Sequence, residues 1–160
     1  MPRPQGALPA EFAEIGPSPW TEPFWLAARD HRLTVPRCTT CGTFRFPPGP
    51  FCAQCQHQDV EQVEVSGVGT VYTYTVARHG VVPMLADYVP YVVAVIELDG
   101  APGIRMIANI VESDPQAVRI GSRVELAWDD VTDDVTIPRF RLVAAQAERT
   151  AAWPAAPSRA

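Results

Sequence analysis

The segment CTTCGTFRFPPGPFCAQC, residues 38–55, holds all four cysteines of the chain as two C-x2-C pairs with ten residues between them. Four thiolates with this spacing can surround one divalent ion as a tetrahedron, provided that each pair lies on a tight turn. Gly42 follows the first pair and can adopt the positive φ that closes such a turn. A zinc site in a compact ribbon of two knuckles, rather than a helical DNA-reading finger, is therefore predicted at Cys38, Cys41, Cys52 and Cys55.

Two disulfides, or a redox-active C-x2-C of the thioredoxin type, are the competing interpretations of these cysteines. The chain opens with Met1-Pro2-Arg3-Pro4-Gln5-Gly6, which lacks the charged and apolar regions of an export signal, so an oxidised, exported protein is not expected. Zinc is therefore preferred. Four thiolates leave no position for water or substrate, so we expect a structural metal. A ribbon of about 30 residues is smaller than the roughly 40 that usually fold unaided, so removal of zinc should unfold it.

The amino-acid composition of the chain argues against several classes of function. A chain of 160 residues with 47% hydrophobic residues can bury one ordinary core plus a small metal-held module. The net charge of -5 and the pI near 5.1 argue against a general nucleic-acid binder, which must neutralise phosphates. All thirteen basic residues are arginine, which excludes a Schiff-base lysine and a phosphate-loop lysine. The sequence contains no run of about 18 apolar residues, so we expect a cytoplasmic protein without a membrane span.

The first 60 residues divide into three predicted parts. Residues 1–17 are rich in proline and alanine and are expected to be extended or mobile. Residues 18–35 should form a helix capped by Thr21 and then a strand that leads into the zinc ribbon of residues 36–60. The helix carries an apolar stripe that packs on the protein's own body, the commoner case, or on another subunit: Phe24, Trp25 and Ala28.

Residues 61–144 are predicted to form a five-stranded OB-fold, because short segments rich in β-branched and aromatic residues recur there. The predicted strands are residues 70–76, 91–98, 105–110, 123–128 and 139–143. Gly67 and Gly69 indicate a bulge or sharp bend before the first strand. Between the third and fourth strands, a helix cap followed by proline predicts a small helix over residues 113–118. Residues 145–160 lose all periodicity and are expected to form a tail.

The chain offers no evident catalytic constellation. Its cysteines are assigned to zinc, and no serine lies in a G-x-S-x-G elbow. His31 and His57 follow the predicted helix and the second knuckle and are interpreted as structural, whereas the role of His79, in a long loop between barrel strands, stays open. Four acidic residues between the last two strands lack the spacing of an EF-hand loop and are interpreted as a solvated turn: Asp129, Asp130, Asp133 and Asp134.

The order of motifs resembles one family, the acyl-CoA-associated zinc-ribbon and OB-fold proteins filed as domain of unknown function 35. The motifs are Phe24-Trp25, Cys38-x2-Cys41-Gly42, Phe46-Pro47-Pro48, Cys52-x2-Cys55, Gly67-x-Gly69 and Pro90-Tyr91. The second knuckle departs mildly from the family by having Ala53 where many relatives have proline. The resemblance implies a mainly β fold, with an N-terminal helix, a rubredoxin-like zinc ribbon and a five-stranded OB-fold barrel, whose zinc ligands are the four cysteines. It also implies an accessory subunit, since members bind thiolase-like enzymes or hot-dog enoyl-CoA hydratases.

From this resemblance, the leading hypothesis is a non-catalytic subunit that completes the acyl-CoA channel of a thiolase-fold enzyme. The reaction would be thiolysis or retro-aldol cleavage, for example in steroid or aromatic side-chain degradation. By position alone, Arg45 and Phe46 at the ribbon tip and Arg78 and His79 in the barrel loop are candidate CoA contacts, in a groove between the two modules; ordinary surface arginines are the alternative. Three other functions stay open: a hot-dog hydratase subunit, a stand-alone acyl-CoA-binding protein, and a single-stranded nucleic-acid module, which the charge opposes.

Overall fold

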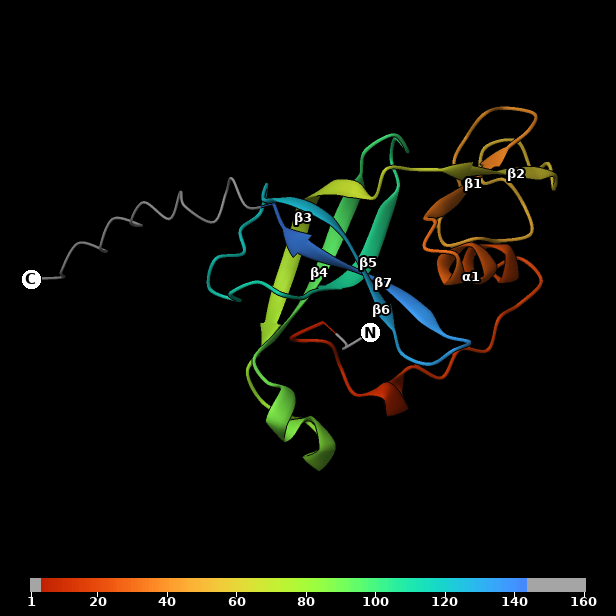
Figure 1. Cartoon of the computed structure of the whole chain (residues 1–160). Helices are drawn as coiled ribbons and strands as arrows, with labels where there is room; N and C mark the ends of the chain where they lie inside the picture. The colour runs from red at the N-terminus through yellow and green to blue at the C-terminus, as the bar shows by residue number, and fades with distance from the viewer. Residues whose placement is uncertain (1–3, 144–160) are drawn as a thin grey trace, which may run out of the picture.

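The computed structural model describes residues 4–143 (Figure 1). The helical elements are η1 (Ala10–Phe12), α1 (Glu22–Arg29) and η2 (Pro83–Tyr88), and the strands are β1 (Thr34–Cys38), β2 (Val60–Glu64), β3 (Val68–Ala77), β4 (Tyr91–Leu98), β5 (Arg105–Ile110), β6 (Arg123–Asp130) and β7 (Thr136–Leu142). Among the described residues, no helix has the length and apolarity needed to cross a bilayer. The predicted tail of residues 145–160 lies outside the described residues.

The last five strands close into a barrel in the order β3-β4-β5-β7-β6, which confirms the predicted five-stranded OB-fold. Neighbouring strands are antiparallel except β5 and β7, which meet in parallel at Ile110 and Phe140. Strands β4 and β5 have the predicted bounds, and the ends of β3, β6 and β7 differ from prediction by up to three residues. Alternate residues face the interior, as in β4, where Val92, Ala94, Ile96 and Leu98 are buried.

Two glycines allow the chain to pass from β2 into the barrel. Gly67 has a φ of +71°, and a Cβ there would lie 2.7 Å from the Cβ of Leu126 on β6. At Gly69 a Cβ would lie 2.6 Å from the backbone oxygen of Glu97 on β4. Only glycine fits such close approaches without displacing a neighbouring strand. The sharp bend predicted before this strand is confirmed. A shift in the register of the β3–β4 pairing lies further along β3, between Val71 and Thr73.

Helix α1 and the ribbon share one apolar core with the barrel. The ribbon is the antiparallel pair β1–β2, and its Val35 and the preceding Leu33 are buried in the same cluster as Phe140 of the barrel. Phe24 of α1 is also buried in this cluster, and half-buried Trp25 packs edge-on against it, with ring centroids 4.9 Å apart. The apolar stripe of α1 therefore packs on the rest of this protein, which is the alternative that the sequence favoured over packing on another subunit. Burial of each large side chain contributes about 1.5–3 kcal/mol, which joins the helix and ribbon to the barrel.

The start of α1 differs from the prediction in one detail. The helix begins at Glu22 with Pro23 in its first turn, but the Thr21 hydroxyl makes no capping hydrogen bond to it. Instead, Thr21 Oγ1 accepts the backbone N–H of Ser18 at 2.8 Å. Thr21 therefore occupies the predicted N-cap position, but its hydroxyl stabilises the preceding turn and does not cap the helix.

The N-terminal arm, defined here as residues 4–13, lies against the outside of the barrel. Ala7 is buried with Val111 and Ala127, and the backbone N–H of Glu112 donates to the backbone oxygen of Gln5 at 2.8 Å. Figure 1 shows this segment running beside β6 and β7 toward η1. Residues 4–13 are part of the segment 1–17 that was predicted to be extended or mobile. They are held in place on the barrel, since small side chains such as Ala7 fit closely on a strand surface.

The small helix predicted over residues 113–118 does not form. The segment makes one turn, in which the Asp114 carboxylate accepts the N–H of Gln116 at 2.8 Å. Val118 is then buried in the core, and the N–H of Gly121 donates to the backbone oxygen of Val71 at 2.8 Å. These barrel contacts require the chain to leave the helical path after a single turn.

Candidate metal centre

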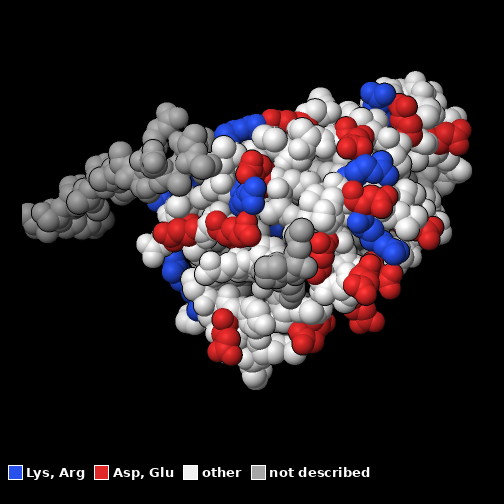
Figure 2. Space-filling view, in the orientation of Figure 1, with Lys and Arg blue, Asp and Glu red and all other residues white. Residues whose placement is uncertain are grey.

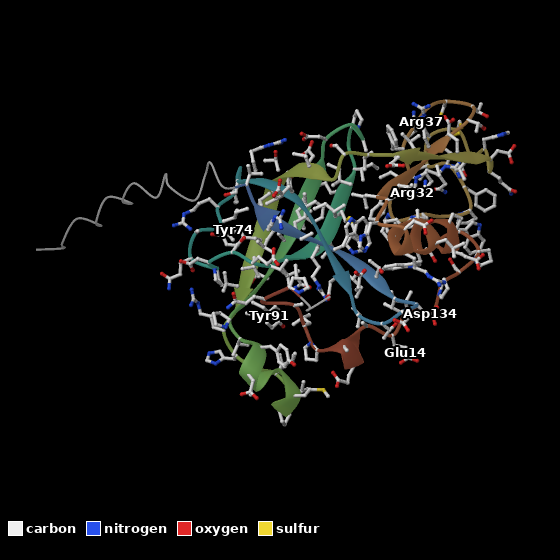
Figure 3. All side chains as sticks on the ribbon, in the orientation of Figure 1. Glu14, Arg32, Arg37, Tyr74, Tyr91 and Asp134 are labelled. Carbon is white, nitrogen blue, oxygen red and sulfur yellow. The ribbon has the colours of Figure 1, made fainter. Side chains whose placement is uncertain are left out.

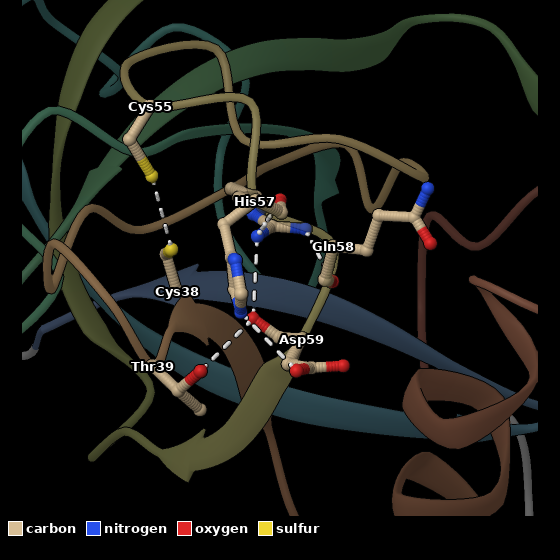
Figure 4. Close-up of polar contacts among 7 residues, drawn as sticks. Cys38, Thr39, Cys55, His57, Gln58 and Asp59 are labelled. Carbon is tan, nitrogen blue, oxygen red and sulfur yellow. Dashed lines mark hydrogen bonds and ion pairs between the residues drawn. The ribbon is translucent and has the colours of Figure 1, made fainter.

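The four cysteines converge at the end of the ribbon, with Cys38 and Cys41 on the first knuckle and Cys52 and Cys55 on the second. Their four Sγ atoms all lie within 4.8 Å of one another. Two contacts join the knuckles, from Cys38 Sγ to Cys55 Sγ at 3.6 Å (Figure 4) and from Cys41 Sγ to Cys52 Sγ at 3.5 Å. Cys38 and Cys52 are buried, whereas Cys41 and Cys55 are exposed.

The two knuckles have the same backbone design. In the first, the N–H of Gly42 donates to the backbone oxygen of Cys38 at 2.9 Å, and in the second the N–H of Gln56 donates to that of Cys52 at 2.9 Å. Gly42 has a φ of +73° and Gln56 a φ of +63°. The positive φ predicted at Gly42 is confirmed. Gln56 adopts the same left-handed conformation without the freedom of glycine, which costs roughly 1–2 kcal/mol.

The geometry and the donor set fit a zinc ion. A tetrahedron with Zn–S bonds of about 2.3 Å has edges of about 3.8 Å, close to the observed contacts between the knuckles. All four cysteines are free, and their sulfurs are much further apart than the roughly 2.05 Å of a disulfide bond, which contradicts the disulfide alternative. Four thiolates complete the coordination of Zn²⁺, so the site can stabilise the ribbon but offers no open position for substrate.

The surroundings favour ionisation of the two buried cysteines. The backbone N–H of Cys41, with a smaller effect of the Arg45 guanidinium, lowers the pKa of Cys38 to about 5 against the opposing effect of desolvation. The backbone N–H of Cys55 is the main cause of the lowered pKa of Cys52. At Cys55, the backbone N–H of His57 acts to lower the pKa, but desolvation and the other three thiols outweigh it and raise the pKa to about 12. Zinc binding removes this difference, since every ligand must be a thiolate.

Two of the predicted CoA contacts, Arg45 and Phe46, lie inside the ribbon. Arg45 is 6% exposed, and its guanidinium donates to the backbone oxygens of His57 at 2.7 Å and Gln58 at 3.0 Å. Phe46 packs against Phe24 of α1, with ring centroids 5.8 Å apart. Arg45 is therefore neither a free arginine at the ribbon tip nor an ordinary surface arginine, because its guanidinium is already engaged.

Arg78 and His79, the other two predicted CoA contacts, are exposed and follow the end of β3. The ribbon precedes the start of β3, and a ten-residue strand spans about 30 Å. In Figure 3, Tyr91, which pairs with Ala77, lies far across the barrel from Arg37 of the ribbon. The structure does not bring the two predicted pairs together, so this chain alone does not form the predicted groove between them. The CoA contacts of all four residues stay a prediction.

The contacts of His31 and His57 agree with the structural role predicted for both. His31 Nε2 lies 2.8 Å from an Asp130 carboxylate oxygen, and its ring stacks on Trp128 of β6 at 5.3 Å between centroids. These contacts join the end of α1 to the barrel. His57 Nε2 lies 3.1 Å from Asp59 Oδ2, within the second knuckle (Figure 4).

The acidic segment contains a correction to the sequence prediction. Asp133 and Asp134 are exposed in the turn after β6, as expected, but Asp129 is fully buried. Its Oδ2 accepts a hydrogen bond from Nε of buried Arg139 on β7 at 2.7 Å, and Arg139 also donates to the side-chain oxygen of Asn109 on β5. Strand alternation places these residues on the outer wall of the barrel, so the predicted solvated turn is wrong for Asp129, which lies in β6. No local signal in the sequence indicated their burial.

A cleft of about 810 Å³ lies where the N-terminal arm meets the start of β4 and the segment after β5. Its lining includes the acidic side chains Asp87, Glu112 and Asp114 together with Tyr88 and Tyr91. A lining of this charge is unfavourable for phosphate groups. On the face drawn in Figure 2, arginines alternate with acidic residues and form no continuous basic stripe of the kind that nucleic-acid binders carry.

Two family models match the chain, one on the ribbon and one on the barrel. Residues 25–61 match the rubredoxin-like zinc ribbon domain of ChsH2, and residues 62–129 match the C-terminal OB-fold domain of ChsH2. The zinc-ribbon match contains all four cysteines.

Relatives with curated descriptions are found among bacteria and archaea. A probable enoyl-CoA hydratase alpha subunit of Thermomonospora curvata is 42% identical over 126 residues, which cover 78% of this chain but only 38% of that protein, so the chain spans about two fifths of its length. A DUF35 domain-containing scaffold protein of Methanocaldococcus jannaschii is 37% identical, over 61% of this chain and 68% of that protein. Among solved structures, a chain described as Ltp2-ChsH2(DUF35) aldolase is 37% identical with a TM-score of 0.73, over 81% of this chain and 98% of that one.

Proposed function

Because this chain belongs to the DUF35 family of zinc-ribbon and OB-fold proteins, we propose that it is the non-catalytic subunit of an assembly that acts on acyl-CoA thioesters. Its partner in this proposal is a thiolase-fold enzyme that cleaves a carbon–carbon bond by thiolysis or retro-aldol chemistry, as in the degradation of steroid or aromatic side chains. The partner supplies the catalytic groups. This chain stabilises the partner and completes its acyl-CoA channel.

The match to the Ltp2-ChsH2(DUF35) aldolase chain is the observation that carries this proposal. This chain covers 98% of the matched chain, so the likeness extends over all of the polypeptide that carries the aldolase description in that structure. The description of the archaeal relative as a scaffold protein supports the same non-catalytic role. A closed four-thiolate site agrees with it, because such a metal stabilises a fold and does not activate substrate.

Exposed apolar side chains support a role that depends on a partner. Large apolar residues are exposed in three separate regions of the surface: Trp20 and Leu26 at α1, Val81, Val82, Met84 and Tyr88 in the segment between β3 and β4, and Ile107 and Ile120 on and near the barrel. Val81 is 86% exposed and Ile107 71% exposed, which is costly in water without a partner. The four exposed residues in the segment between β3 and β4 lie close together in the chain, and a gathering of exposed apolar side chains commonly indicates a protein interface.

A hydratase subunit is the second candidate, and the name of the Thermomonospora curvata relative favours it. The match covers only 38% of the protein that has this name, so most of that protein lies outside the match. A hydratase activity of the whole relative can therefore reside in the part of that protein outside the match. For this reason the aldolase-type partner is preferred.

Both candidates can be tested by purifying the tagged chain from its native host and identifying any protein that copurifies in stoichiometric amounts. The complex is then assayed with acyl-CoA substrates for three reactions: CoA-dependent thiolysis, retro-aldol release of a carbonyl product, and hydration of an enoyl-CoA. A variant with Cys38→Ser and Cys41→Ser, which cannot assemble the ribbon, is the matched control. We expect a thiolase-fold partner whose cleavage activity falls when this chain is removed and returns when it is added.

A hot-dog partner with hydratase activity would replace the preferred reaction by the second candidate. A monomer that copurifies with no enzyme, and that binds acyl-CoA by calorimetry, would reject the accessory role. Binding to single-stranded DNA that weakens with salt would instead support the nucleic-acid alternative.

A further inference from the structure

Arg45 joins the two knuckles of the metal centre from inside the ribbon. Its backbone N–H donates to the backbone oxygen of Pro36 in β1 at 2.8 Å, which places the residue beside the strand that ends in Cys38. Its side chain reaches the exit of the second knuckle, where Nη2 donates to His57 at 2.7 Å and Nη1 to Gln58 at 3.0 Å, in both cases to the backbone oxygen. The same His57 oxygen accepts the N–H of Cys52 at 2.9 Å.

The charge of this guanidinium lacks a carboxylate partner among residues 4–143. Backbone oxygens satisfy its two terminal nitrogens, but its Nε is buried without a hydrogen-bond acceptor. A buried arginine whose charge is not compensated is strongly unfavourable, so such a residue normally has an anion beside it. The sulfurs of Cys38 and Cys52 can supply this negative charge, since Arg45 pairs with the strand that ends in Cys38 and shares the His57 oxygen with the N–H of Cys52.

The electrostatics of the loaded site make this placement favourable. Four thiolates around one Zn²⁺ carry a net charge of about −2, and the buried thiolates are the ones least able to be stabilised by water. A permanent cation inside the ribbon offsets part of this charge. Groups that contact metal ligands in this way typically change metal affinity by about 10- to 100-fold when they are removed.

We propose that Arg45 is a positioning residue of the metal centre: its buried guanidinium compensates the charge of the four thiolates and holds the second knuckle against β1, so that Cys52 and Cys55 face the metal. This role in metal retention is separate from the CoA contact predicted for the same residue.

The test compares Arg45→Lys, which keeps the charge, with Arg45→Gln, which keeps hydrogen-bond donors but loses the charge. Arg37→Gln is the matched control, because Arg37 lies in the same ribbon but is exposed and paired with Glu61 at 2.7 Å. Zinc affinity of the full chain is measured by competition with a chromophoric chelator, and Co²⁺ spectra report whether the ion stays tetrahedral with four sulfur ligands. We expect Arg45→Gln to weaken zinc binding by about 10- to 100-fold, Arg45→Lys to stay within about tenfold of the wild type, and Arg37→Gln to have no effect.

A second set of variants, made in a protein that carries Cys55→His, separates compensation of charge from mechanical support of the second knuckle (bracing). Cys55→His keeps a known zinc ligand set, Cys₃His, but removes one negative charge from the site. If Arg45 compensates charge, Arg45→Gln should reduce zinc affinity by a smaller factor in this background than in the wild type.

Several outcomes would overturn the proposal. One is that Arg45→Gln binds zinc as tightly as Arg37→Gln does. Another is that Arg45→Lys loses as much affinity as Arg45→Gln, because the positive charge would then be irrelevant. If the Gln variant fails to fold, a loss of more than about tenfold in Arg45→Lys overturns the proposal on its own. An equal loss with and without Cys55→His would assign Arg45 to bracing alone.

Discussion

Replacement of Arg139 by methionine should destabilise the protein far more than any exposed arginine does. Arg139 and Asp129 are 4% and 0% exposed, and their Nε and Oδ2 atoms lie 2.7 Å apart. Methionine fills a similar volume but leaves the carboxylate of Asp129 buried without the guanidinium. Removal of one partner of a buried ion pair costs about 3–5 kcal/mol, which is a large part of the roughly 5–15 kcal/mol that stabilises a domain.

The assay is urea unfolding of the zinc-loaded protein, followed by tryptophan fluorescence. With an m-value of about 2 kcal/mol/M, a loss of 3–5 kcal/mol lowers the midpoint by roughly 2 M. Arg141→Met is the matched control, because Arg141 lies two residues further along β7 but is exposed, where it pairs with Glu125 at 2.8 Å. Its replacement should cost at most about 1 kcal/mol.

The double variant Asp129→Leu with Arg139→Met completes the cycle. Because it removes both charges, it should be considerably more stable than Arg139→Met alone, as replacement of a buried pair by apolar residues often costs little. Equal midpoints for Arg139→Met and Arg141→Met would refute this reasoning. That result would mean that water reaches Asp129, and hence that the N-terminal arm does not cover this wall of the barrel in solution.

Three further outcomes are expected. Removal of zinc with a chelator should expose residues 38–58 to proteolysis, and Cys38→Ser should do the same without chelator; protection of this segment in the apo protein would contradict a structural role for the metal. Gln56→Gly should raise, and Gly42→Ala lower, the unfolding free energy of the zinc-loaded protein by about 1 kcal/mol each, because both positions have positive φ. Hydrogen bonds from Arg123 hold the pKa of Asp99 below its usual range, so this pair stabilises the protein above the unfolded pKa of about 3.9 and loses its effect as the pH falls through the lower folded pKa. Because both side chains are partly exposed, Asp99→Asn should cost less than about 1 kcal/mol at pH 7 and nothing near pH 2, and a cost independent of pH would count against the ion pair.

The parts of the fold that the sequence could predict are those encoded by local patterns. The cysteine spacing identifies the ribbon because the ligand set requires two tight turns, and both turns have the expected hydrogen bonds. The strands β4 and β5 were predicted with the observed bounds because both are short segments with β-branched or aromatic residues between turn-forming residues. The bend at Gly67 and Gly69 could also be predicted, since glycine permits a close approach to a neighbouring strand that another residue would prevent.

The features that the sequence could not predict depend on segments distant in the chain. Asp129 and Arg139 occupy outward positions of their strands, and only the docking of the N-terminal arm on the same wall, seen at Ala7 and Ala127, explains why this wall is buried. Arg45 stands between Phe44 and Phe46 in a proline-rich stretch typical of an exposed tip, and its burial depends on the second knuckle folding over it. A charged side chain in a loop gives no local sign that a later segment will enclose it.

The position of the charged groups also bears on how CoA would be bound. Arg45 is enclosed by the second knuckle, whereas Arg78 and His79 follow the far end of β3, a strand about 30 Å long, so this chain does not gather these cations around one phosphate-binding point. The cleft beside the N-terminal arm contains Asp87, Glu112 and Asp114, which disfavour a pyrophosphate. A stand-alone CoA-binding protein would need the opposite arrangement. These observations favour the accessory-subunit proposal over a stand-alone CoA-binding protein, and from them we expect the partner enzyme to supply phosphate contacts.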